Sequence, residues 1–567
     1  MRVLPILVIV FLAVFAVVIG LTVMWNNGSG TSTTTASMPK FLGGKPQGHV
    51  YTGVAGEPSD VNPLTSFDPL ATRMLLPYTH DALLDQDPTD ASIRGALADE
   101  YVVADDGLSC TFRLREGVLF SDGSPMTMAD VLFGWELAKA DKLAMGAIGS
   151  CFARVKSVTA TDERHLCVTF TGAAFSTVND VGLSWTVVQK KFFVDGVRAR
   201  LADGEAMPEI ASARFADLLS QIKKRCGPGT GPYALLNDPD GVTNWRRRQE
   251  VLLTRNEHSW RRKLRPGTWN FAGMRTLFRD QNGAQNALLR QEVDWFSGAQ
   301  PDQLLASQPQ LKKSYKKLVY DYPTLGAFRF VWNCKQKPFD DVRVRRALAM
   351  LVNQAEMTKV FDGAAKAAVA HAKVGSRAYP DVKATPFDPK AARKLLREAG
   401  HDPEAGEPLR MNILTYQGHE PTRRMLELFA SAAKDAGIEL ELHVRESSGV
   451  AAALSAGTWH GLLEHRAFTQ WGDPYAILHS EGLENLGKWQ HQEADRLTEL
   501  ARTKLDPAER ADIWRKLHKL VHEEQPAALI LHPLAAVLFH KDIEDCVVGP
   551  LGLRPNMAWV EPAKQRQ

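Results

Sequence analysis

The sequence has little of several features that would mark a specialised class of protein. It has only six cysteines in 567 residues, too few for a disulfide-dense scaffold, and none of them shows the close spacing of a zinc site. The formal net charge of +3 is too small to indicate nucleic-acid binding by bulk charge. Apolar residues make up 44% and charged residues 23% of the chain. This is ordinary globular usage, and it excludes a disordered, collagenous or polytopic membrane protein.

Long hydrophobic runs are absent except for one, near the N-terminus. Val3 to Trp25 is a run of 23 residues without a charge, and as a helix it would extend about 34 Å, enough to cross a hydrocarbon core of about 30 Å. A cleaved signal has a shorter apolar region before a small-residue cleavage site, of which Thr34-Thr35-Ala36 is only a weak example. Residues 1–25 therefore predict an uncleaved transmembrane anchor. A removed signal and a buried core helix are the alternatives.

The residues that flank this run indicate which side of the membrane the rest of the chain occupies. Arg2 adjoins the run, whereas Lys40 and Lys45 lie well beyond it, so the positive-inside rule places the N-terminus in the cytoplasm. Residues 26–48 are rich in glycine, serine and threonine and predict a flexible linker. We expect the body to lie outside the cytoplasmic membrane and to be anchored to it, or to be free in the periplasm if the segment is cleaved.

Two of the cysteines lie in segments that have the alternation of strands. Cys110 falls within 109–114 and Cys167 within 166–170. An even number of cysteines is compatible with an oxidising compartment. The two would form a disulfide if these strands were neighbours, and otherwise they would be buried free thiols. The sequence leaves both possibilities open.

From residue 49 onward, short strand-like runs alternate with amphipathic helices, without the regular spacing of one doubly wound sheet. Thr127 followed by Asp130 predicts a capped helix start. Asp388-Pro389 at one end and Gly400 at the other are typical of helix boundaries. The patterns together predict a mixed α+β structure. The expected helices are 130–139, 341–352, 388–399, 423–436 (stopped by Gly437) and 507–523, and the clearest expected strand is 438–444.

Six stretches, taken in order, resemble the solute-binding proteins (family 5) of peptide and nickel ATP-driven importers. GVLFSDGSPMTMADV at 117–131 is similar to the family's most recognisable block, and GTGPY at 229–233 and KPFDDVRVRRAL at 337–348 match two others. No single match is specific, but the series follows the family's order along most of the chain. The other stretches are EPSDVNP at 57–63, LADEY and DDGLSCTFRLR between 97 and 115, and QPAALI at 525–530 with VGPLG at 548–552.

The resemblance implies the two-lobed periplasmic-binding-protein fold (class II type, cluster C), in which hinge strands let the lobes close over a ligand. The first lobe would hold residues 49–320, with an extra subdomain at roughly 93–210, and the second lobe residues 321–525. Residues 526–567 would return to the first lobe. The chain would cross between lobes near Tyr322-Pro323 and near Leu529-Ile530.

The resemblance also indicates where a ligand would be held, and this chain departs from the pattern there. Peptide-binding members hold the ligand's amino group with a carboxylate, a position that falls on Gln470 when the chain is aligned on Asp473-Pro474. Dipeptide binders clamp the free carboxylate with an arginine, where this chain has Tyr416. A free dipeptide is therefore disfavoured, and a neutral or extended peptide-like solute is favoured. The expected ligand-binding residues are Glu57, Asn62, Tyr416, Gln417, Gly418, His419, Gln470, Trp471, Asp473 and Tyr475.

Some of these residues and motifs have a structural alternative. Trp471 and Tyr475 would equally suit the core of the second lobe, and His419 would suit an exposed loop. Asp122-Gly123 is typical of a turn that needs a positive φ, and the glycines of GTGPY fit a tight turn. No Lys-Ser or Lys-Thr follows these glycines, which disfavours a phosphate-binding loop. We expect the helix face formed by Arg343, Arg345 and Arg346 to be solvated.

Signals for catalysis or metal binding are weak. His518 and His522 are four residues apart on an expected helix. This spacing can hold zinc, but a His-Glu-x-x-His motif and a third ligand are missing, so we expect both on a solvated face. No Gly-x-Ser-x-Gly nucleophile elbow occurs. We expect no enzyme activity, no cofactor and no metal.

The sequence thus predicts a monomeric extracytoplasmic receptor that closes its lobes on a peptide-like solute and delivers it to the permease subunits of an ABC importer. It predicts a membrane contact through the N-terminal segment and no nucleic-acid partner. The alternative is the same fold acting as a membrane-tethered ligand sensor or scaffold without a transport partner.

Overall fold

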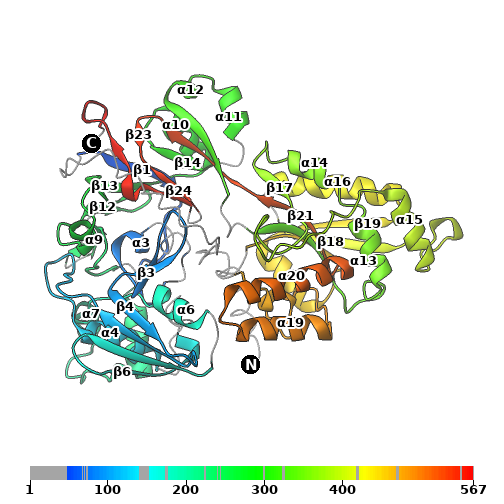
Figure 1. Cartoon of the computed structure of the whole chain (residues 1–567). Coiled ribbons are helices and arrows are strands. Elements are labelled where there is room, and N and C mark those ends of the chain that lie inside the picture. The colour runs from blue at the N-terminus through cyan, green and yellow to red at the C-terminus, as the bar shows by residue number, and fades with distance from the viewer. Residues whose placement is uncertain are drawn as a thin grey trace. The chain divides into compact units, whose positions relative to one another are not determined.

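The structure is a computed structural model of the chain, and the described residues form two compact units (Figure 1). One unit is continuous, Val319–Ala536, and the other consists of residues up to Leu318 together with Val537–Gln567. The expected anchor at 1–25 and nearly all of the linker lie outside the described residues. No helix in the described part is long and apolar enough to span a membrane. The structure describes residues 48–66, 68, 71, 75–139, 152–172, 176–222, 225–235, 237–238, 241–242, 244–297, 301–321, 326–416, 420–467, 472–549 and 552–565.

The continuous unit, 319–536, is built on a six-stranded sheet of order β17-β21-β16-β20-β18-β19. β18 (Arg410–Tyr416) is parallel to both β20 (Gly461–Arg466) and β19 (Glu439–Arg445). β16 (Ala327–Trp332) is antiparallel to β20 and to β21 (Ala527–Pro533), and β17 (Ala365–Ala367) borders β21. β18 and β20 therefore end at the same edge of the sheet.

The exit from this unit lies later in the chain than we expected. The resemblance suggested a return to the first lobe at residue 526, with a crossing near Leu529-Ile530. In the structure both residues belong to β21, which pairs with β16 in the central sheet. The 319–536 unit, which corresponds to the expected second lobe, accordingly extends to Ala536. The other expected crossing, at Tyr322-Pro323, falls outside the described residues.

Local signals mark several helix ends in this unit, although the expected helix 341–352 ends already at Ala349 and the expected helix 423–436 begins at Glu420. The Asp388 carboxylate accepts a hydrogen bond from Ala391 N at 2.9 Å and caps α15 (Pro389–Glu398). Gly400 and Gly437 follow α15 and α16 (Glu420–Asp435) with φ of +93° and +80°. The other helices are α13 (Val342–Ala349), α14 (Gln354–Lys359), α17 (Ser447–Ala456), α18 (Tyr475–Leu478), α19 (Gln492–Thr503) and α20 (Pro507–Glu524).

Aromatic packing joins the sheet to α16. Phe330 and Trp332 lie two residues apart on β16 with parallel rings, and Phe429 of α16 packs against Phe330 with ring centroids 4.4 Å apart. All three side chains are fully buried. Burial of aliphatic and aromatic surface of this kind is worth roughly 1.5–3 kcal/mol per large side chain, and it fixes α16 against the sheet.

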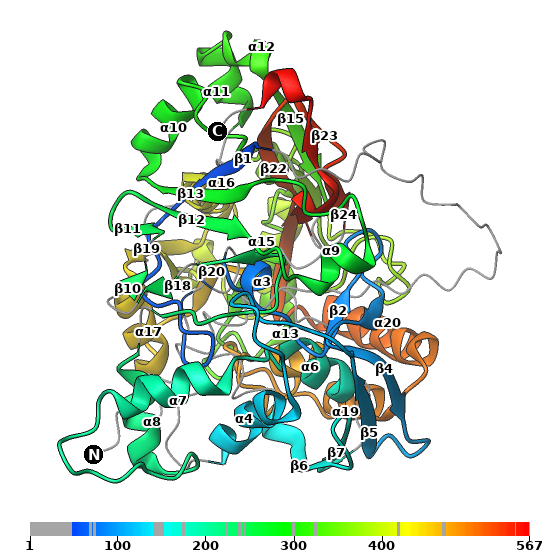
Figure 2. The ribbon, with the colours of Figure 1, turned by 90° about the vertical axis from the view of Figure 1, so that its left-hand side faces the viewer.

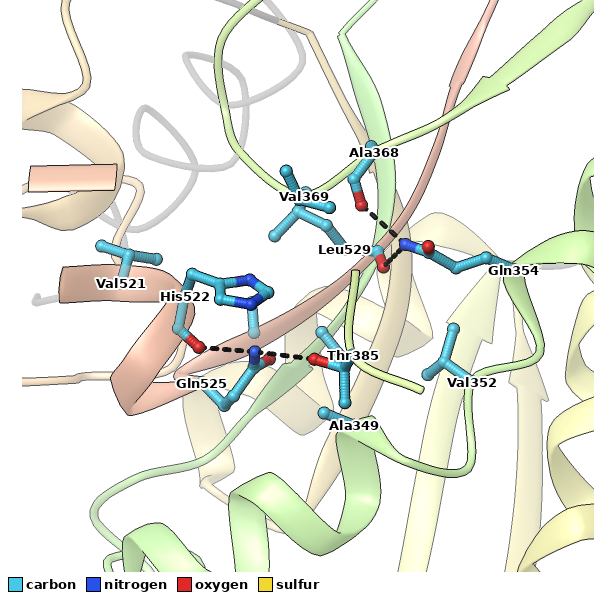
Figure 3. A pocket seen from close by; sticks show the side chains of 12 residues that line it. Ala349, Val352, Gln354, Ala368, Val369, Thr385, Val521, His522, Gln525 and Leu529 are labelled. Atoms are coloured by element: carbon cyan, nitrogen blue, oxygen red, sulfur yellow. Dashed lines mark hydrogen bonds between the residues drawn. The ribbon is translucent and has the colours of Figure 1, made fainter. Parts of the chain in front are cut away.

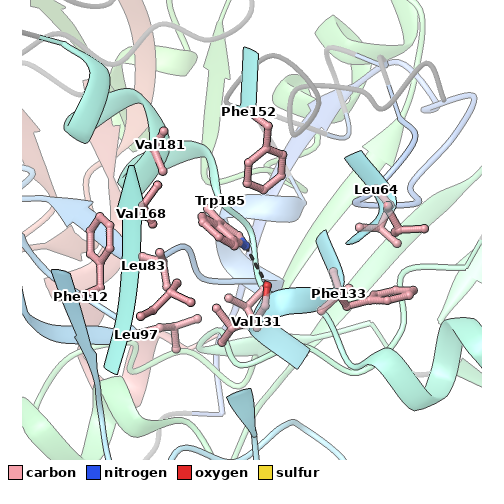
Figure 4. Close-up of a cluster of buried hydrophobic side chains, with 14 of the residues drawn as sticks. Leu64, Leu83, Leu97, Phe112, Val131, Phe133, Phe152, Val168, Val181 and Trp185 are labelled. Carbon is pink, nitrogen blue, oxygen red and sulfur yellow. Dashed lines mark hydrogen bonds between the residues drawn. The ribbon is translucent and has the colours of Figure 1, made fainter. Parts of the chain in front are cut away.

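The other unit contains a small subdomain with its own core (Figure 4). Its four-stranded sheet has the order β4-β5-β7-β6. The fully buried Trp185 donates from its indole N–H to the Val131 carbonyl at 3.0 Å, so the polar atom of this large side chain is satisfied. Thr127 and Asp130 form the predicted capping box at the start of α4 (Met128–Ala138). The strands and remaining helices are β4 (Ala98–Val103), β5 (Ser109–Leu114), β6 (Val155–Ala160), β7 (His165–Phe170), α6 (Thr177–Ser184), α7 (Lys190–Arg198) and α8 (Ala213–Ser220).

The rest of this unit is built on two further sheets. In the larger one β13 (Gly273–Phe278) lies between β1 (Val50–Ala55), which is parallel to it, and β12 (Glu250–Arg255), which is antiparallel. In the smaller one β22 (Ala535–His540) lies between β14 (Trp295–Ser297) and β15 (Tyr315–Tyr320). Short elements complete the unit: α3 (Leu76–Thr79), β2 (Leu84–Gln86), β3 (Ile93–Gly95), β8 (Tyr233–Ala234), β9 (Asn237–Asp238), β10 (Gly241–Val242), β11 (Trp245–Arg246), α9 (Trp260–Leu264), α10 (Gln281–Leu289), α11 (Pro301–Ser307), α12 (Leu311–Ser314), β23 (Ile543–Glu544), β24 (Val547–Gly549), β25 (Gly552–Arg554) and β26 (Trp559–Val560).

Two glycine motifs serve the fold for different reasons. Gly123 has a φ of +85°, as the Asp-Gly turn predicted. In the GTGPY motif the reason is space, because a Cβ on Gly231 would lie 2.5 Å from the Tyr78 carbonyl oxygen and one on Gly229 2.0 Å from the Thr79 carbonyl oxygen. This segment passes against the backbone of the last residues of α3, and only glycine permits that approach.

The cysteine alternatives are resolved in favour of free thiols. β5 and β7 are neighbours, but the register sets Cys110 opposite Val168 and Cys167 opposite Thr111. Both cysteines are free. Burial raises the pKa of the Cys110 thiol to about 12, so this thiol is protonated at neutral pH.

One arginine of the RVRRAL helix departs from the expected solvated face. Arg345 is buried, and its guanidinium donates to the carbonyls of Phe339, Asp340 and Glu524 at 2.8–3.1 Å. It also contacts the Glu524 carboxylate at 3.2 Å. Arg345 thereby joins the start of α13 to the end of α20, and its role is packing between helices.

Candidate functional site

The two segments that the sequence singled out follow neighbouring parallel strands of the 319–536 unit. Tyr416 is the last residue of β18 and Arg466 is the last residue of β20. In parallel sheets the carboxyl ends of strands are the usual position of ligand sites. Five of the expected ligand-binding residues come directly after these strands but lie outside the described residues: Gln417, Gly418, His419, Gln470 and Trp471.

Tyr416, one of the expected ligand-binding residues, has an accessible side chain at this edge and is 39% exposed. Partial burial, together with the nearby Glu464 carboxylate, raises the pKa of its hydroxyl, so it is a neutral hydrogen-bonding group with an aromatic face. Such a group suits a polar but uncharged part of a ligand.

Asp473 and Tyr475 form a compact group with two neighbouring side chains. The Asp473 carboxylate accepts hydrogen bonds from Arg502 Nε at 2.9 Å and from Tyr475 N at 3.0 Å. The Arg502 guanidinium lies 4.1 Å above the Tyr475 ring, which also stacks on His479 with centroids 4.2 Å apart. Because Asp473 is already paired with a cation of its own unit, it is a poor substitute for the missing amine-binding carboxylate.

Glu57 and Asn62 belong to the other unit, and both make hydrogen bonds to residues of that same unit. Glu57 accepts from the indole N–H of Trp245 at 3.0 Å and from Arg248 N at 3.1 Å. Asn62 is fully buried, and its amide donates to Ile222 O and accepts from Leu64 N, both at 3.0 Å. Through these contacts Asn62 stabilises the turn after β1. A role for Asn62 in ligand binding stays a prediction.

A buried network of charged side chains lies at the carboxyl end of β20, and the sequence reasoning did not identify it. Arg329 on β16 is directly opposite Glu464 on β20, and its guanidinium donates to Glu464 Oε1 at 2.7 and 3.0 Å. Arg466, two residues along β20, donates to Glu464 Oε2 at 2.9 Å and lies 3.6 Å from Glu484. Arg329 also contacts His371 Nε2 at 2.7 Å. The side chains of Arg329, Glu464 and Arg466 are 3–5% exposed.

The charge states within the network follow from burial and pairing. Burial opposes ionisation of Glu464, but the charges of Arg466 and Arg329 outweigh it and lower the pKa of this carboxyl. Burial raises the pKa of Glu484, and burial beside Arg329 lowers the pKa of His371 well below its usual range. Two guanidinium groups thus face one strongly ionised carboxylate, one weaker acid and one neutral imidazole.

One cavity among the described residues is small (Figure 3). It has a volume of about 20 Å³ and lies in the 319–536 unit between the end of α20 and the β17 region. The Gln354 amide spans one side by donating to Ala368 O and Leu529 O at 2.6 and 2.9 Å, and the Gln525 amide donates to His522 O at 2.7 Å. This volume holds about one water molecule, so the cavity is not a peptide site.

The paired histidines of α20 are not on a solvated face. His518 is fully buried, its Nδ1 lies 3.0 Å from Ala378 O, and burial lowers its pKa to about 4. His522, one turn later, is half-buried and lines the small cavity. Across the described part of the chain, no group of three or more His, Cys, Asp or Glu is arranged to hold a metal ion.

Comparison with known proteins identifies the class. The family of bacterial extracellular solute-binding proteins, family 5 (Middle), matches residues 92–482. The chain is 26% identical over 527 residues to di/tripeptide-binding protein 2 of Pseudomonas aeruginosa, covering 86% of this chain and 91% of that protein. It is 23% identical over 545 residues to the oligopeptide-binding protein AppA of Bacillus subtilis, covering 92% and 93%.

Solved structures agree on the fold. The structure of AppA from Bacillus subtilis in complex with a nonapeptide matches with a TM-score of 0.70 at 21% identity, covering 91% of this chain and all of that one. The substrate-binding protein CtaP of Listeria monocytogenes matches with a TM-score of 0.74 at 19% identity over the same shares. The chain therefore belongs to the family 5 bacterial extracellular solute-binding proteins, and it has their mixed α/β fold.

Proposed function

We propose that this protein is the solute receptor of an ABC importer and binds a peptide-like solute outside the cytoplasmic membrane. The observation that carries the proposal is the family match over residues 92–482, since relatives along nearly the whole chain are named for di-, tri- and oligopeptide binding. The permease subunits of the importer are its partners. Residues 1–25 anchor it to the membrane, and the receptor acts as a monomer.

The ligand is an extended or neutral peptide whose amino and carboxyl ends are not bound by ion pairs. Gln470 and Tyr416 stand where family members that bind free dipeptides have a carboxylate and an arginine, and Asp473 is neutralised by Arg502. Tyr416, at the end of β18, offers a stacking face and a hydroxyl to such a ligand. Binding to this edge draws on hydrogen bonds and aromatic contact.

Binding, not chemical conversion, is the proposed activity. The carboxylates at the sheet edge support this view, because Glu464 and Asp473 are each held by arginine and neither is poised as a general base. If the proposal is correct, a bound solute is recovered with its mass unchanged after prolonged incubation with the protein. Recovery of a cleaved solute would contradict it.

Native mass spectrometry of the full chain, released from detergent micelles, tests the receptor proposal directly. A co-purifying mass that leaves on denaturation would identify the solute, and peptides of matching length would then be titrated by calorimetry. We expect peptides with acetylated and amidated ends to bind within about threefold of the free peptides, a difference below ~1 kcal/mol. Strict dependence on a free amine and a free carboxylate would overturn the ligand class.

Replacement of Tyr416 tests the location of the site. We expect Tyr416→Ala to weaken binding about tenfold, since a buried aromatic contact is worth on the order of 1–3 kcal/mol. Leu442→Ala is the matched control, because Leu442 is 41% exposed on the outer strand β19 and should leave affinity unchanged. Equal effects of the two substitutions would remove Tyr416 from the site.

A further inference from the structure

Four exposed lysines gather at one end of the unit that contains β1. Lys312 and Lys313 lie on α12, Lys316 on β15, and Lys541 in the turn after β22. Lys541 joins the two segments, since its ammonium donates to the Lys312 carbonyl at 2.6 Å and its backbone N–H to Ser314 O at 2.8 Å. Lys316 lies 6.0 Å from the Phe539 ring of β22. We call these four residues the lysine patch.

The patch carries charge that its own surroundings do not neutralise. Two neighbouring lysines are ion-paired, Lys317 with Asp302 and Lys564 with Asp542 and Glu561. In the part of the chain that the structure describes, none of the four patch lysines lies within ion-pairing distance of a carboxylate. The patch is therefore a local excess of positive charge on a chain whose total is only +3.

The patch lies beside the point where the described chain begins. Gly48 donates to Gln565 Oε1 at 3.1 Å, and the next residue, His49, contacts the Asp294 carboxylate at 3.1 Å. The Asp294 carbonyl accepts from His540 N at 2.7 Å, and His540 immediately precedes Lys541. Figure 2 shows α12, β15, β22 and β1 at the same end of this unit. A chain that leaves the body at Gly48 therefore starts next to the patch.

We propose that the lysine patch is a membrane-facing surface that binds anionic phospholipid headgroups. This inference rests on the proposed anchoring of residues 1–25, because a linker of 26–48 holds the patch within reach of the bilayer. Lysines close to an anionic leaflet are each attracted to it, and the attraction disappears beyond a Debye length. The contact orients this unit against the membrane and keeps the receptor near its permease.

The test is lysine acetylation, measured by mass spectrometry, on the full chain reconstituted in lipid vesicles. We expect the patch lysines to react about fivefold more slowly in vesicles with about 30% phosphatidylglycerol than in neutral phosphatidylcholine, at about 50 mM salt. The protection should vanish at about 500 mM salt. Lys394, which is 80% exposed in the other unit, is the internal reference and should react equally in both lipids.

Substitution separates this contact from anchoring. In the patch variant K312Q/K313Q/K316Q/K541Q, the remaining lysines of this unit should be acetylated equally in both lipids. K390Q/K394Q/K434Q/K516Q is a control with the same charge change at exposed positions. Equal acetylation of the wild-type patch in the two lipids, or protection that survives high salt, would overturn the proposal. A chain that fails to stay with neutral vesicles would overturn the anchoring instead, and salt-sensitive sedimentation with anionic vesicles would still test the patch. Protection that requires a co-reconstituted permease would assign the patch to a protein partner and overturn lipid binding.

Discussion

At the scale of single residues, the buried charges of Arg329, Glu464 and Arg466 are the most consequential feature of the 319–536 unit. Each ion loses hydration on burial, and only its partners offset that cost. Glu464 serves both arginines through separate oxygen atoms. The arrangement depends on one carboxylate, so its removal affects two cations at once.

We expect Glu464→Gln to lower the free energy of unfolding by about 3–5 kcal/mol, since removing one member of a buried pair leaves the others uncompensated. Urea unfolding followed by circular dichroism measures this. Glu427→Gln is the matched control, because Glu427 pairs with Arg423 at an exposed surface and should change stability by less than about 1 kcal/mol. The double variant Arg329→Met/Glu464→Leu should cost less than the sum of its single changes, and strict additivity would show that the pair is not coupled.

Buried histidines make stability depend on pH. Burial lowers the pKa of His518 and of His80 to about 4, against 6.5 for an exposed histidine. Each is neutral in the folded state and gains a proton on unfolding below pH 6.5. Their contribution to stability is complete above pH 6.5 and is lost as the pH falls towards 4, at about 1.4 kcal/mol per pH unit for each group.

His518→Gln tests this dependence, because glutamine cannot gain the proton. We expect its free energy of unfolding, measured in urea at intervals from pH 7 to 4.5, to fall less steeply than that of the wild type by about 1.4 kcal/mol per pH unit. Parallel slopes for the two proteins would contradict a neutral His518 in the fold.

At the scale of elements, close backbone contact in the GTGPY turn should be intolerant of a single methyl group. Gly231→Ala places a Cβ 2.5 Å from the Tyr78 carbonyl oxygen, so we expect a loss of about 2–4 kcal/mol as the turn moves away from the backbone of α3. Gly172→Ala is the control, since nothing lies within 4 Å of its added Cβ. Thermal unfolding of both variants measures the difference, and similar midpoints would contradict the steric reason.

Elements with local signals could be predicted from the sequence, and contacts between distant segments could not. Asp388 and Gly400 bound α15 because capping and a positive φ depend on a few adjacent residues. Arg329 and Glu464 are 135 positions apart, and neither carries a local mark of its partner. The burial of His518 was missed for the same reason, because no local signal marks its contact with the carbonyl of Ala378, 140 positions away.

The candidate site was predictable only as far as the resemblance reached. Aligned motifs placed Tyr416 and the segment after Arg466 at the ligand, and pairing of β18 with β20 brings the two strand ends to one edge. Asn62 was selected by its motif, yet it is buried with both amide atoms bonded to backbone. A motif of seven letters does not distinguish a residue that shapes a turn from one that faces a ligand.

At the scale of the whole molecule, the five cysteines within the described residues form no disulfide. Cys110, Cys167, Cys226, Cys334 and Cys546 are free. We expect iodoacetamide to label these five thiols in urea without any reductant, with masses read peptide by peptide. Peptides of Cys110 or Cys167 that become labelled only after reduction would instead indicate a bond across β5 and β7.

The division of the chain has a consequence for how the molecule is made. The 319–536 unit is one uninterrupted stretch, whereas the unit with β1 requires residues 537–567, which supply most of β22 and all of β23 to β26. During synthesis and export from the N-terminus onward, the later-encoded unit has all its strands before the earlier-encoded one does. The unit that emerges first is thus the last to be completed. Until residues 535–540 have emerged, β14 and β15 lack the strand that lies between them.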